Sequence, residues 1–237
     1  LRSINLYEDE IGKVELVEHM GSDLTIVNSA RVSFGKHKEK IDDSDKRLIR
    51  YLAKHKHTST FEHNIITFRF VVPLFVRAQH HRHRTWSYNE ISRRYTDVNI
   101  QFYEPKAFRT QHKSNRQASN ENELINPEVP FNHPEMTSPI TQDASALVRR
   151  HNQASLELFD NLLESGVCRE QARGVLPQNM YTEYYGTVNL SNLLKFVDLR
   201  THEGAQWEIQ KVAEACLDIA EELFPVAVSS YRKAKNE

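Results

Sequence analysis

Alternating and helical patterns of apolar residues divide the first part of the chain into strands and helices. Residues 13–17 alternate between polar and apolar positions, as a strand with one buried face does. Ser22 or Asp23 suits the N-cap of a helix that runs to about Arg31. Asp43-Ser44 suits the start of a second helix, and the apolar residues that follow at helical spacing are Leu48, Ile49, Leu52 and Ala53.

A second strand and a third helix are predicted next. Residues 65–72 are rich in β-branched and aromatic side chains, which favour strands. Pro73 ends this strand and suits the first turn of a helix that extends to about Thr85. Residues 89–92 are predicted to lie in the following loop, and the alternation of residues 98–102 predicts a returning strand. One side of that helix would carry Arg77, His80, His81 and Arg84.

The last third of the chain also follows regular patterns. Helices are predicted over residues 147–165, 169–175, 191–200 and 205–223, and a strand over residues 181–190. Gly166 suits the C-terminal cap of the first of these helices, and Ser191 suits the N-cap of the third.

Residues 104–143 differ from the rest, because Asn, Ser, Pro, Gln and charged residues dominate without a sustained period. This composition predicts a long surface excursion. A lid over an active site and an inert insertion both fit it, and the insertion is favoured. Since neither a repeat nor a second boundary is visible, residues 1–237 are predicted to form a single α+β domain with a modest central sheet flanked by helices.

Composition limits the class of protein. A formal net charge of −1 argues against a protein that coats nucleic acid, because such domains are usually strongly basic. No apolar run approaches the roughly 18 residues of a membrane span, and the N-terminus lacks a signal-like apolar stretch. Cys168 and Cys216 have no metal-type or redox-type spacing. A cytoplasmic protein without membrane or nucleic-acid partners is predicted.

One segment concentrates positive charge and aromatic rings. Residues 82–95 read RHRTWSYNEISRRY. Guanidinium groups bind phosphate oxygens through paired hydrogen bonds, hydroxyls add further bonds, and aromatic faces stack on heterocycles. This mixture suits a phosphate attached to a flat ring, although a solvated, charged helix face is the plainer interpretation of an arginine-rich stretch.

The spacing inside this segment carries a resemblance to a known family. Arg82-His83-Arg84 followed after seven residues by Ser92 resembles the signature of the flavin-dependent thymidylate synthases. Further blocks that resemble the family, in its order, are residues 20–24, 30–34, 57–63, 169–173, 199–200 and 205–209. The resemblance implies reductive methylation of dUMP to dTMP, with methylenetetrahydrofolate as carbon donor and FAD, reduced by NADPH, as hydride source. It also implies a homotetramer with active sites shared between subunits.

The resemblance further implies a role for each matching residue. Arg200 matches the arginine that polarises the uracil ring, although a surface ion pair with Asp198 or Glu203 is the plainer fate of such a residue. His57 matches a position that lines the folate and nicotinamide site. The implied dUMP ligands are Gln79, Arg82, Glu90, Ile91, Ser92, Arg93, Arg94, Arg173 and Arg200. The implied FAD ligands are Ser33, Ser59, Glu62, Arg82, His83, Arg84, Glu90, Asn189 and Lys195.

Three positions depart from the family pattern. Arg93 stands where a glycine is common, so it would either crowd the phosphate loop or add a contact. Ser191 and Lys195 replace an arginine and an asparagine or histidine of related chains. Lys195 keeps a donor for a phosphate, whereas Ser191 would only cap its helix.

Other catalytic schemes are less well supported by the residues. Cys216 lies on an apolar stripe, where thiols are usually inert, and Cys168 has two arginines nearby but no adjacent base. Ser92 lacks the glycines of a nucleophile elbow. The two histidine groups, residues 55–63 and 80–83, lack a familiar metal-ligand spacing, so no metal is predicted.

The cofactor would be bound by side chains rather than by a glycine-rich loop. None of the seven glycines forms a Gly-x-Gly-x-x-Gly motif, so a Rossmann-type site is not expected. A non-catalytic nucleotide- or RNA-binding module remains the alternative function, because the basic and aromatic segment would also suit one.

Overall fold

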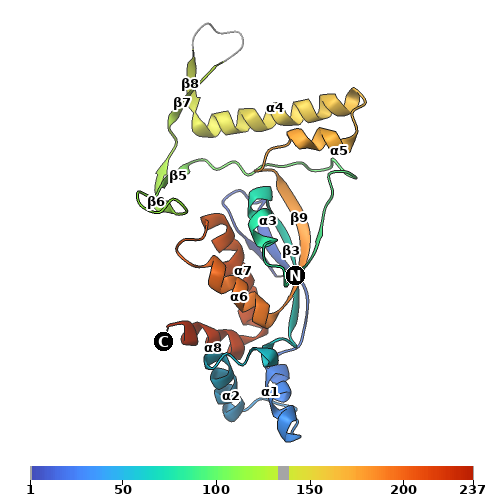
Figure 1. Cartoon of the computed structure of the whole chain (residues 1–237), viewed down its shortest axis with the longest axis vertical. Helices are drawn as coiled ribbons and strands as arrows, with labels where there is room; N and C mark the ends of the chain where they lie inside the picture. Colours follow the sequence, from blue (N-terminus) through green and yellow to red (C-terminus); the bar gives the residue numbers. More distant parts are fainter. Residues whose placement is uncertain (1, 133–138, 237) are drawn as a thin grey trace.

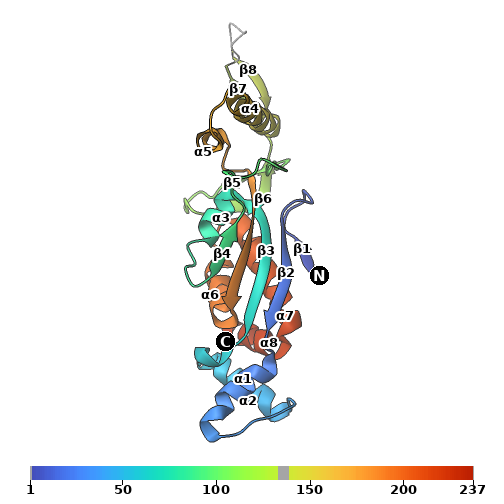
Figure 2. The same cartoon turned by 90° about the vertical axis from the view of Figure 1, so that its right-hand side faces the viewer.

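An antiparallel sheet of five strands forms the centre of the computed structural model, which describes residues 2–132 and 139–236 (Figures 1 and 2). In spatial order the strands are β1 (Ser3–Asn5), β2 (Lys13–Met20), β3 (Ile65–Pro73), β9 (Tyr181–Asn189) and β4 (Ser87–Glu90). Every neighbouring pair in this sheet is antiparallel. The prediction of a modest, non-Rossmann sheet in an α+β fold is confirmed.

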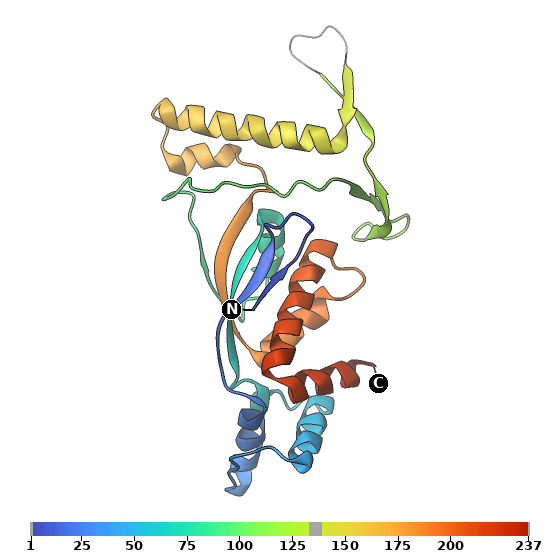
Figure 3. The same cartoon turned by 180° about the vertical axis from the view of Figure 1, so that it is seen from behind.

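The two faces of the sheet differ because β3 alternates in sequence. Ile66, Phe68, Phe70 and Val72 are fully buried, whereas Thr67 and Arg69 point to the opposite, partly exposed face. The buried face packs against α6 (Leu190–Arg200) and α7 (Trp207–Leu223), which lie side by side on it (Figure 3). One covered face and one polar face is the usual arrangement of an antiparallel sheet.

The polar face of the sheet carries its own network. Arg69 donates to Glu183 across the β3–β9 pair at 2.6 and 2.7 Å, and it also contacts Glu15 on β2. Thr67 and Thr187 share a hydrogen bond of 3.0 Å between their hydroxyls. These cross-strand pairs tie three strands together on the face opposite the helices.

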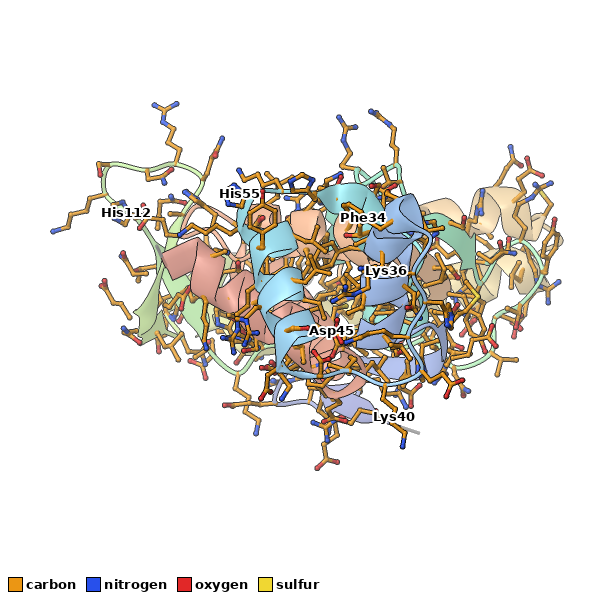
Figure 4. All side chains as sticks on the ribbon, turned by 90° about the horizontal axis from the view of Figure 1, so that it is seen from below. Phe34, Lys36, Lys40, Asp45, His55 and His112 are labelled. Carbon is orange, nitrogen blue, oxygen red and sulfur yellow. The ribbon has the colours of Figure 1, made fainter. Side chains whose placement is uncertain are left out.

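Three helices close the lower end of the sheet in Figure 1. They are α1 (Asp23–Arg31), α2 (Asp43–Lys54) and α8 (Pro225–Asn236), of which α8 was not predicted from the sequence. Asp45 is fully buried between α1 and α2, where it accepts from Arg31 at 2.5 Å and from Lys38 at 2.7 Å (Figure 4). The N-cap of α2 is Asp42, one residue before the predicted Asp43-Ser44.

Three further sequence predictions in the motif region are wrong, the first because Asn89 and Glu90 of the predicted loop 89–92 belong to β4. The helix α3 (Leu74–His80) ends well before Thr85, because the Tyr88 hydroxyl donates to the carbonyls of His80 and His83 at 3.0 and 3.1 Å. Arg82, His83 and Arg84 therefore lie in the turn between α3 and β4. The predicted strand over residues 98–102 is reduced to one bridge between Phe102 and Met180. The Val98 carbonyl accepts a hydrogen bond from the Arg93 side chain instead of from a neighbouring strand.

The polar excursion forms an arm at the upper end of the molecule (Figure 1). Its described part contains two ribbons, β5 (Phe108–Gln111) with β6 (Ser119–Ile125) and β7 (Glu128–Phe131) with β8 (Ile140–Asp143). Residues 133–138 of the excursion lie outside the described residues. The long helix α4 (Ala144–Glu164) and the short α5 (Arg169–Ala172) follow it. Because both faces of such ribbons are largely exposed, their sequence has no apolar period.

Candidate active site

Arg200 is the centre of the first group of site residues. It is the last residue of α6, and its Nε donates to Nε2 of His83 at 2.9 Å. Its Nη2 donates to the backbone carbonyl of Gln79 on α3 at 3.0 Å. The alternative ion pair with Asp198 is not formed, because Asp198 instead accepts from the Tyr231 hydroxyl at 2.6 Å. Neutral acceptors therefore orient the Arg200 guanidinium.

The electrostatics of this group keep Arg200 as its cation. Burial, and then the nearby Arg200 charge, lower the pKa of His83 to about 4. Neutral His83 can accept from Arg200, whereas its protonated form has no acceptor nitrogen. Burial also lowers the pKa of Arg200, but a guanidinium remains protonated in proteins. The pair is therefore a fixed cation with a neutral partner at physiological pH.

His80 packs beside the Arg200 group but is not a hydrogen-bond partner of Arg200. Its ring is completely buried, and its Nδ1 lies 2.8 Å from the Tyr184 hydroxyl. Aromatic rings surround it, with centroid distances of 4.5 Å to Trp86 and 4.7 Å to Phe196. Burial holds the pKa of His80 well below its usual range. His80 is thus a packing residue at the end of α3.

The second group lies in the loop after β4. The backbone NH of Ile91 donates to the carbonyl of Glu183 at 2.9 Å, which joins the loop to the sheet edge. Ser92 then caps a turn, since its Oγ accepts from the Arg94 backbone NH at 3.3 Å. Arg94 is exposed and reaches Glu170 on α5 at 3.3 Å. Arg173 follows α5 directly, at the start of η3 (Arg173–Val175), and is also exposed.

Arg93 faces away from this exposed pair of arginines. It is 8% exposed, and its guanidinium donates to the carbonyl of Val98 at 2.8 Å. It also lines a cavity of about 340 Å³ next to Ile91 and Arg69. Arg93 therefore stabilises the loop from its buried side and does not crowd the exposed arginines, although it is a bulky replacement of glycine. Burial lowers its pKa.

The third group surrounds a larger cavity at the lower end of the sheet. This cavity measures about 510 Å³ and has an apolar floor that includes Leu52, Phe61 and Leu194. His57, Ser191 and Lys195 line it, together with Lys54, Lys56, Tyr231 and Lys235. Ser59 lies next to it on η2 (Thr58–Phe61), and Asn189 precedes α6. Asn189, not Ser191, is the N-cap of α6, because its Oδ1 accepts from the Asn192 backbone NH at 2.9 Å.

The remaining residues assigned from the sequence lie at the edges of these groups. Glu90 accepts from the Thr182 hydroxyl at 2.7 Å and pairs with Arg77 at 3.2 Å, so it is fixed at the sheet edge. Arg82, Arg84 and Glu62 are exposed, and Ser33 lies on η1 (Val32–Phe34) after α1. The structure thus brings Gln79, His83 and Arg200 together in one chain, whereas different elements hold Ser92, Arg94 and Arg173.

Sequence reasoning missed several residues of the site. Gln206 contacts the Gln79 side chain, and no role had been assigned to it although residues 205–209 matched the family. Tyr231 and Lys235 line the larger cavity, but α8 had not been recognised. Phe224, Ala227, Val228 and Tyr231 follow helical spacing on a stretch without glycine, and this pattern could have indicated that helix.

Among the described residues, the cysteines and histidines show no alternative catalytic arrangement. Cys216 is fully buried, and burial raises the pKa of its thiol far above its usual value. Cys168 is exposed and lies 3.7 Å from Oε1 of Gln171. Within residues 2–132 and 139–236, no cluster of three or more His, Cys, Asp or Glu side chains is arranged to bind a metal ion. In the same residues, no helix has both the length and the apolar character needed to cross a membrane.

Comparisons with known proteins agree with the motif. The family model described as thymidylate synthase complementing protein matches residues 15–226. A flavin-dependent thymidylate synthase of Thermus thermophilus is 43% identical over 94% of this chain and 76% of its own length. Another flavin-dependent thymidylate synthase, from Thermotoga neapolitana, is 40% identical over 94% of this chain and 91% of its own length.

A solved structure is also similar along its whole length. The UMP/dUMP methylase PolB from Streptomyces cacaoi, in a crystal structure with 5-Br dUMP, superimposes with a TM-score of 0.77 at 34% identity. The alignment covers 97% of each chain. With the Arg-His-Arg turn, the Arg200 group and these similarities together, the chain belongs to the flavin-dependent thymidylate synthase family.

Proposed function

We propose that this chain catalyses the reductive methylation of dUMP to dTMP, with methylenetetrahydrofolate as carbon donor and FAD, reduced by NADPH, as hydride source. The observation that carries the proposal is the Arg200 group in a member of this family. Arg200 is held by neutral His83 and by the Gln79 carbonyl at 2.9 and 3.0 Å, so its charge is directed at a fixed place. A cation fixed in advance stabilises negative charge that develops on a bound ring.

The chain's own residues divide the binding of dUMP between two tasks. Arg200 and Gln79 would contact the uracil, because the Arg200 charge can stabilise the anion that makes C5 nucleophilic. Ser92, Arg94 and Arg173 would bind the phosphate, with a hydroxyl and two exposed guanidinium groups. Buried Cys216 is unsuited to attack the ring, since its raised thiol pKa leaves almost no thiolate.

A homotetramer with shared active sites would join these two groups. Different elements carry them in one chain, namely the α3 and α6 ends for Arg200 and the loop against α5 for Arg94. Apolar side chains beside both arginines are exposed, Leu199 at 65% and Tyr95 at 79%. Exposed apolar groups next to site residues favour cover by a ligand or a second subunit. The Ser92 loop of one subunit would then face Arg200 of another.

The larger cavity has the chemistry to hold part of FAD. Its apolar floor suits a flat ring, and three lysines on its rim, Lys56, Lys195 and Lys235, suit a diphosphate. These lysines supply positive charge in place of the arginine that related chains carry at the position of Ser191. Ser59, Glu62, Asn189 and the exposed Arg82 and Arg84 would add further contacts, and His57 would line the folate and nicotinamide side. Bound there and reduced, the flavin supplies the hydride for the methylation.

A spectroscopic and product assay tests the proposal. The purified protein is reconstituted with FAD, and its visible absorption is recorded without oxygen before and after NADPH, with and without dUMP. Bleaching that dUMP accelerates, followed by dTMP formation when methylenetetrahydrofolate is added, is the expected result. UMP is tested in parallel because the similar Streptomyces protein is described as a UMP/dUMP methylase.

Two outcomes would contradict the proposal. Protein that takes up no flavin, or flavin-loaded protein that leaves labelled dUMP unmethylated, removes the proposed activity. The alternative of an RNA-binding module predicts instead that affinity rises with strand length and falls steeply with salt. A preference for dUMP over oligonucleotides that persists at high salt excludes this alternative.

A further inference from the structure

The smaller cavity, of about 340 Å³, lies on the polar face of the sheet, where no role has been assigned to it. Arg69 of β3 and Glu183 of β9 line its sheet side, and the loop of residues 91–101 lines the other side. Arg93 is the buried residue of this loop, and its Nη1 donates to the Val98 carbonyl at 2.8 Å. The cavity below is called the Arg93 cavity.

The sheet side of the Arg93 cavity is electrically balanced. Arg69 donates to Glu183 at 2.6 and 2.7 Å and also contacts Glu15. Lys13, which lines the same side, pairs with Glu15 at 3.1 Å. Two cations therefore face two carboxylates. The remaining carboxylate of the wall, Glu10, is exposed, so water screens its charge.

Arg93 brings a positive charge that has no such partner. Among the residues that the structure describes, no hydrogen-bond acceptor meets its buried Nε, and the acceptor at its Nη1 is a neutral carbonyl. Asp97 acts on Arg93 through space, but its carboxylate accepts from Arg169 at 2.9 Å. Burial lowers the pKa of Arg93, although a guanidinium remains protonated in proteins. A buried charge of this kind destabilises the fold unless an opposite charge reaches it.

We propose that the Arg93 cavity binds a small oxyanion, of the phosphate or carboxylate class, on the Arg93 guanidinium. The planar fork of a guanidinium matches the paired oxygens of both groups. Asn99 and Gln101 also line the cavity, and their side-chain amides can add neutral donors. Asn99 has a φ of 53°, a left-handed conformation that asparagine tolerates better than most residues. The volume exceeds that of one phosphate group, so water shares the cavity with the anion.

The proposed anion and the dUMP phosphate would bind on opposite sides of one loop. Ser92 and Arg94, assigned to the dUMP phosphate, flank Arg93 in sequence, and Arg94 is exposed and turned to Glu170. Neither Ser92 nor Arg94 lines the Arg93 cavity. The site depends on a residue particular to this chain, because the glycine that is common at this position in related sequences has no side chain to offer.

Phosphorus NMR of inorganic phosphate tests the site in flavin-loaded protein. The line width of the phosphate signal is measured at constant ionic strength, with and without saturating dUMP, which occupies the substrate phosphate site. Broadening that persists with dUMP is the expected result for the wild type. Arg93→Met should raise the dissociation constant for phosphate at least tenfold under these conditions, since it removes a charged donor.

The neighbouring arginine provides the matched control. Arg94→Ala removes an exposed guanidinium from the other side of the loop, and it should leave the dissociation constant for phosphate in dUMP-saturated protein within about twofold. Arg93→Gly, which restores the residue common in the family, should behave like Arg93→Met and serves if that variant does not fold. Labelled acetate is titrated in parallel, because displacement of phosphate by acetate would extend the ligand class to carboxylates.

The outcomes separate this inference from the proposed function. Phosphate broadening that dUMP abolishes in the wild type, or that is unchanged in both Arg93 variants, overturns the site and leaves the proposed function in place. A loss in Arg94→Ala as large as that in Arg93→Met also overturns it. Protein that binds no dUMP contradicts the proposed function alone, since Arg93-dependent binding of phosphate to Arg94→Ala protein would still support the cavity site.

Discussion

Arg200 and Arg94 are assigned to the same substrate, yet the fold holds them in opposite ways. Arg200 ends a helix that packs on the sheet, and neutral His83 and a backbone carbonyl fix its guanidinium. Arg94 lies on an exposed loop, where its ion pair with Glu170 spans 3.3 Å between side chains that are 48% and 64% exposed.

The difference indicates which arginine performs chemistry and which one binds. An exposed ion pair contributes about 0 to 1 kcal/mol, so Arg94 can exchange Glu170 for a phosphate at little cost. A sheltered cation with neutral partners keeps its position and acts in a medium of lower dielectric constant. Arg200 is therefore suited to stabilise charge in a transition state, and Arg94 to capture the substrate.

The largest effect is expected from Arg200→Ala. Loss of a fixed donor to the developing charge should lower kcat about 10²- to 10³-fold while dUMP binding changes less. The rate of dTMP formation, measured at saturating dUMP, checks this. Arg232→Ala removes an exposed arginine that pairs with Asp218 and Glu221, and it should leave kcat within about twofold. Normal turnover in Arg200→Ala would exclude this arginine from the mechanism.

The next largest effect concerns the buried ion pair between Arg109 and Glu208. Arg109→Met leaves Glu208, 4% exposed, as an uncompensated buried charge, which should lower the free energy of unfolding by about 3 kcal/mol. Arg232→Met, in an exposed pair, should cost about 1 kcal/mol or less. Urea denaturation of both variants measures the difference. Equal losses of unfolding free energy in the two variants would mean that the Arg109–Glu208 pair stabilises the protein no more than an exposed ion pair does.

A smaller effect is expected when the capturing arginine is removed. Arg94→Ala should raise the KM for dUMP about tenfold, the value of one charge-assisted hydrogen bond, with kcat nearly unchanged. The KM of the wild type should also rise with salt more steeply than that of the variant, because Arg94 is exposed. Steady-state assays at two salt concentrations measure both quantities. A fall in kcat that exceeds the rise in KM would assign Arg94 to chemistry instead.

The sequence predicted the central sheet well because burial there follows a simple period. Along β3, Ile66, Phe68, Phe70 and Val72 alternate with polar or half-buried residues. This alternation predicts both a strand and the face of the sheet on which each side chain lies. The arm could not be read in this way, since its ribbons are largely exposed on both faces. Its one informative residue, Arg109, acts through a partner about a hundred positions away.

The family resemblance named the candidate site residues, but it did not show how the fold divides them into groups. The family resemblance named Gln79, His83 and Arg200, and the fold brings them together at the ends of two helices. Spacing could not reveal that Arg93 turns inward while Arg94 turns outward, because that depends on the Val98 carbonyl as a partner. Position along the chain likewise could not show that Gln206 meets Gln79, since tertiary packing alone places α7 beside α3.

The smallest effect is a pH dependence that belongs to His83. Its pKa is about 4 in the folded protein, lowered by burial and then by Arg200, whereas an unfolded histidine has a pKa of about 6.5. Between these values the unfolded chain binds a proton that the folded chain does not. The free energy of unfolding should therefore fall as pH decreases from about 6.5 to 4. Since His83 is only partly buried, about 1 kcal/mol is expected from it over this window.

Comparison of variants isolates this contribution from that of buried His80, which acts in the same direction. His83→Gln should flatten the decline measured by urea denaturation at several pH values, and His112→Gln should not. His112 lies in the turn between β5 and β6, where its Nδ1 accepts from the backbone NH groups of Ser114 and Asn115, and is the matched control (Figure 4). Affinity for dUMP should fall below about pH 6 by the same factor in the wild type and in His83→Gln, because the dUMP phosphate gains a proton in both and neutral His83 still accepts from Arg200. A loss of affinity already near pH 6.5, absent in His83→Gln, would show that His83 is protonated in the folded site and does not orient Arg200.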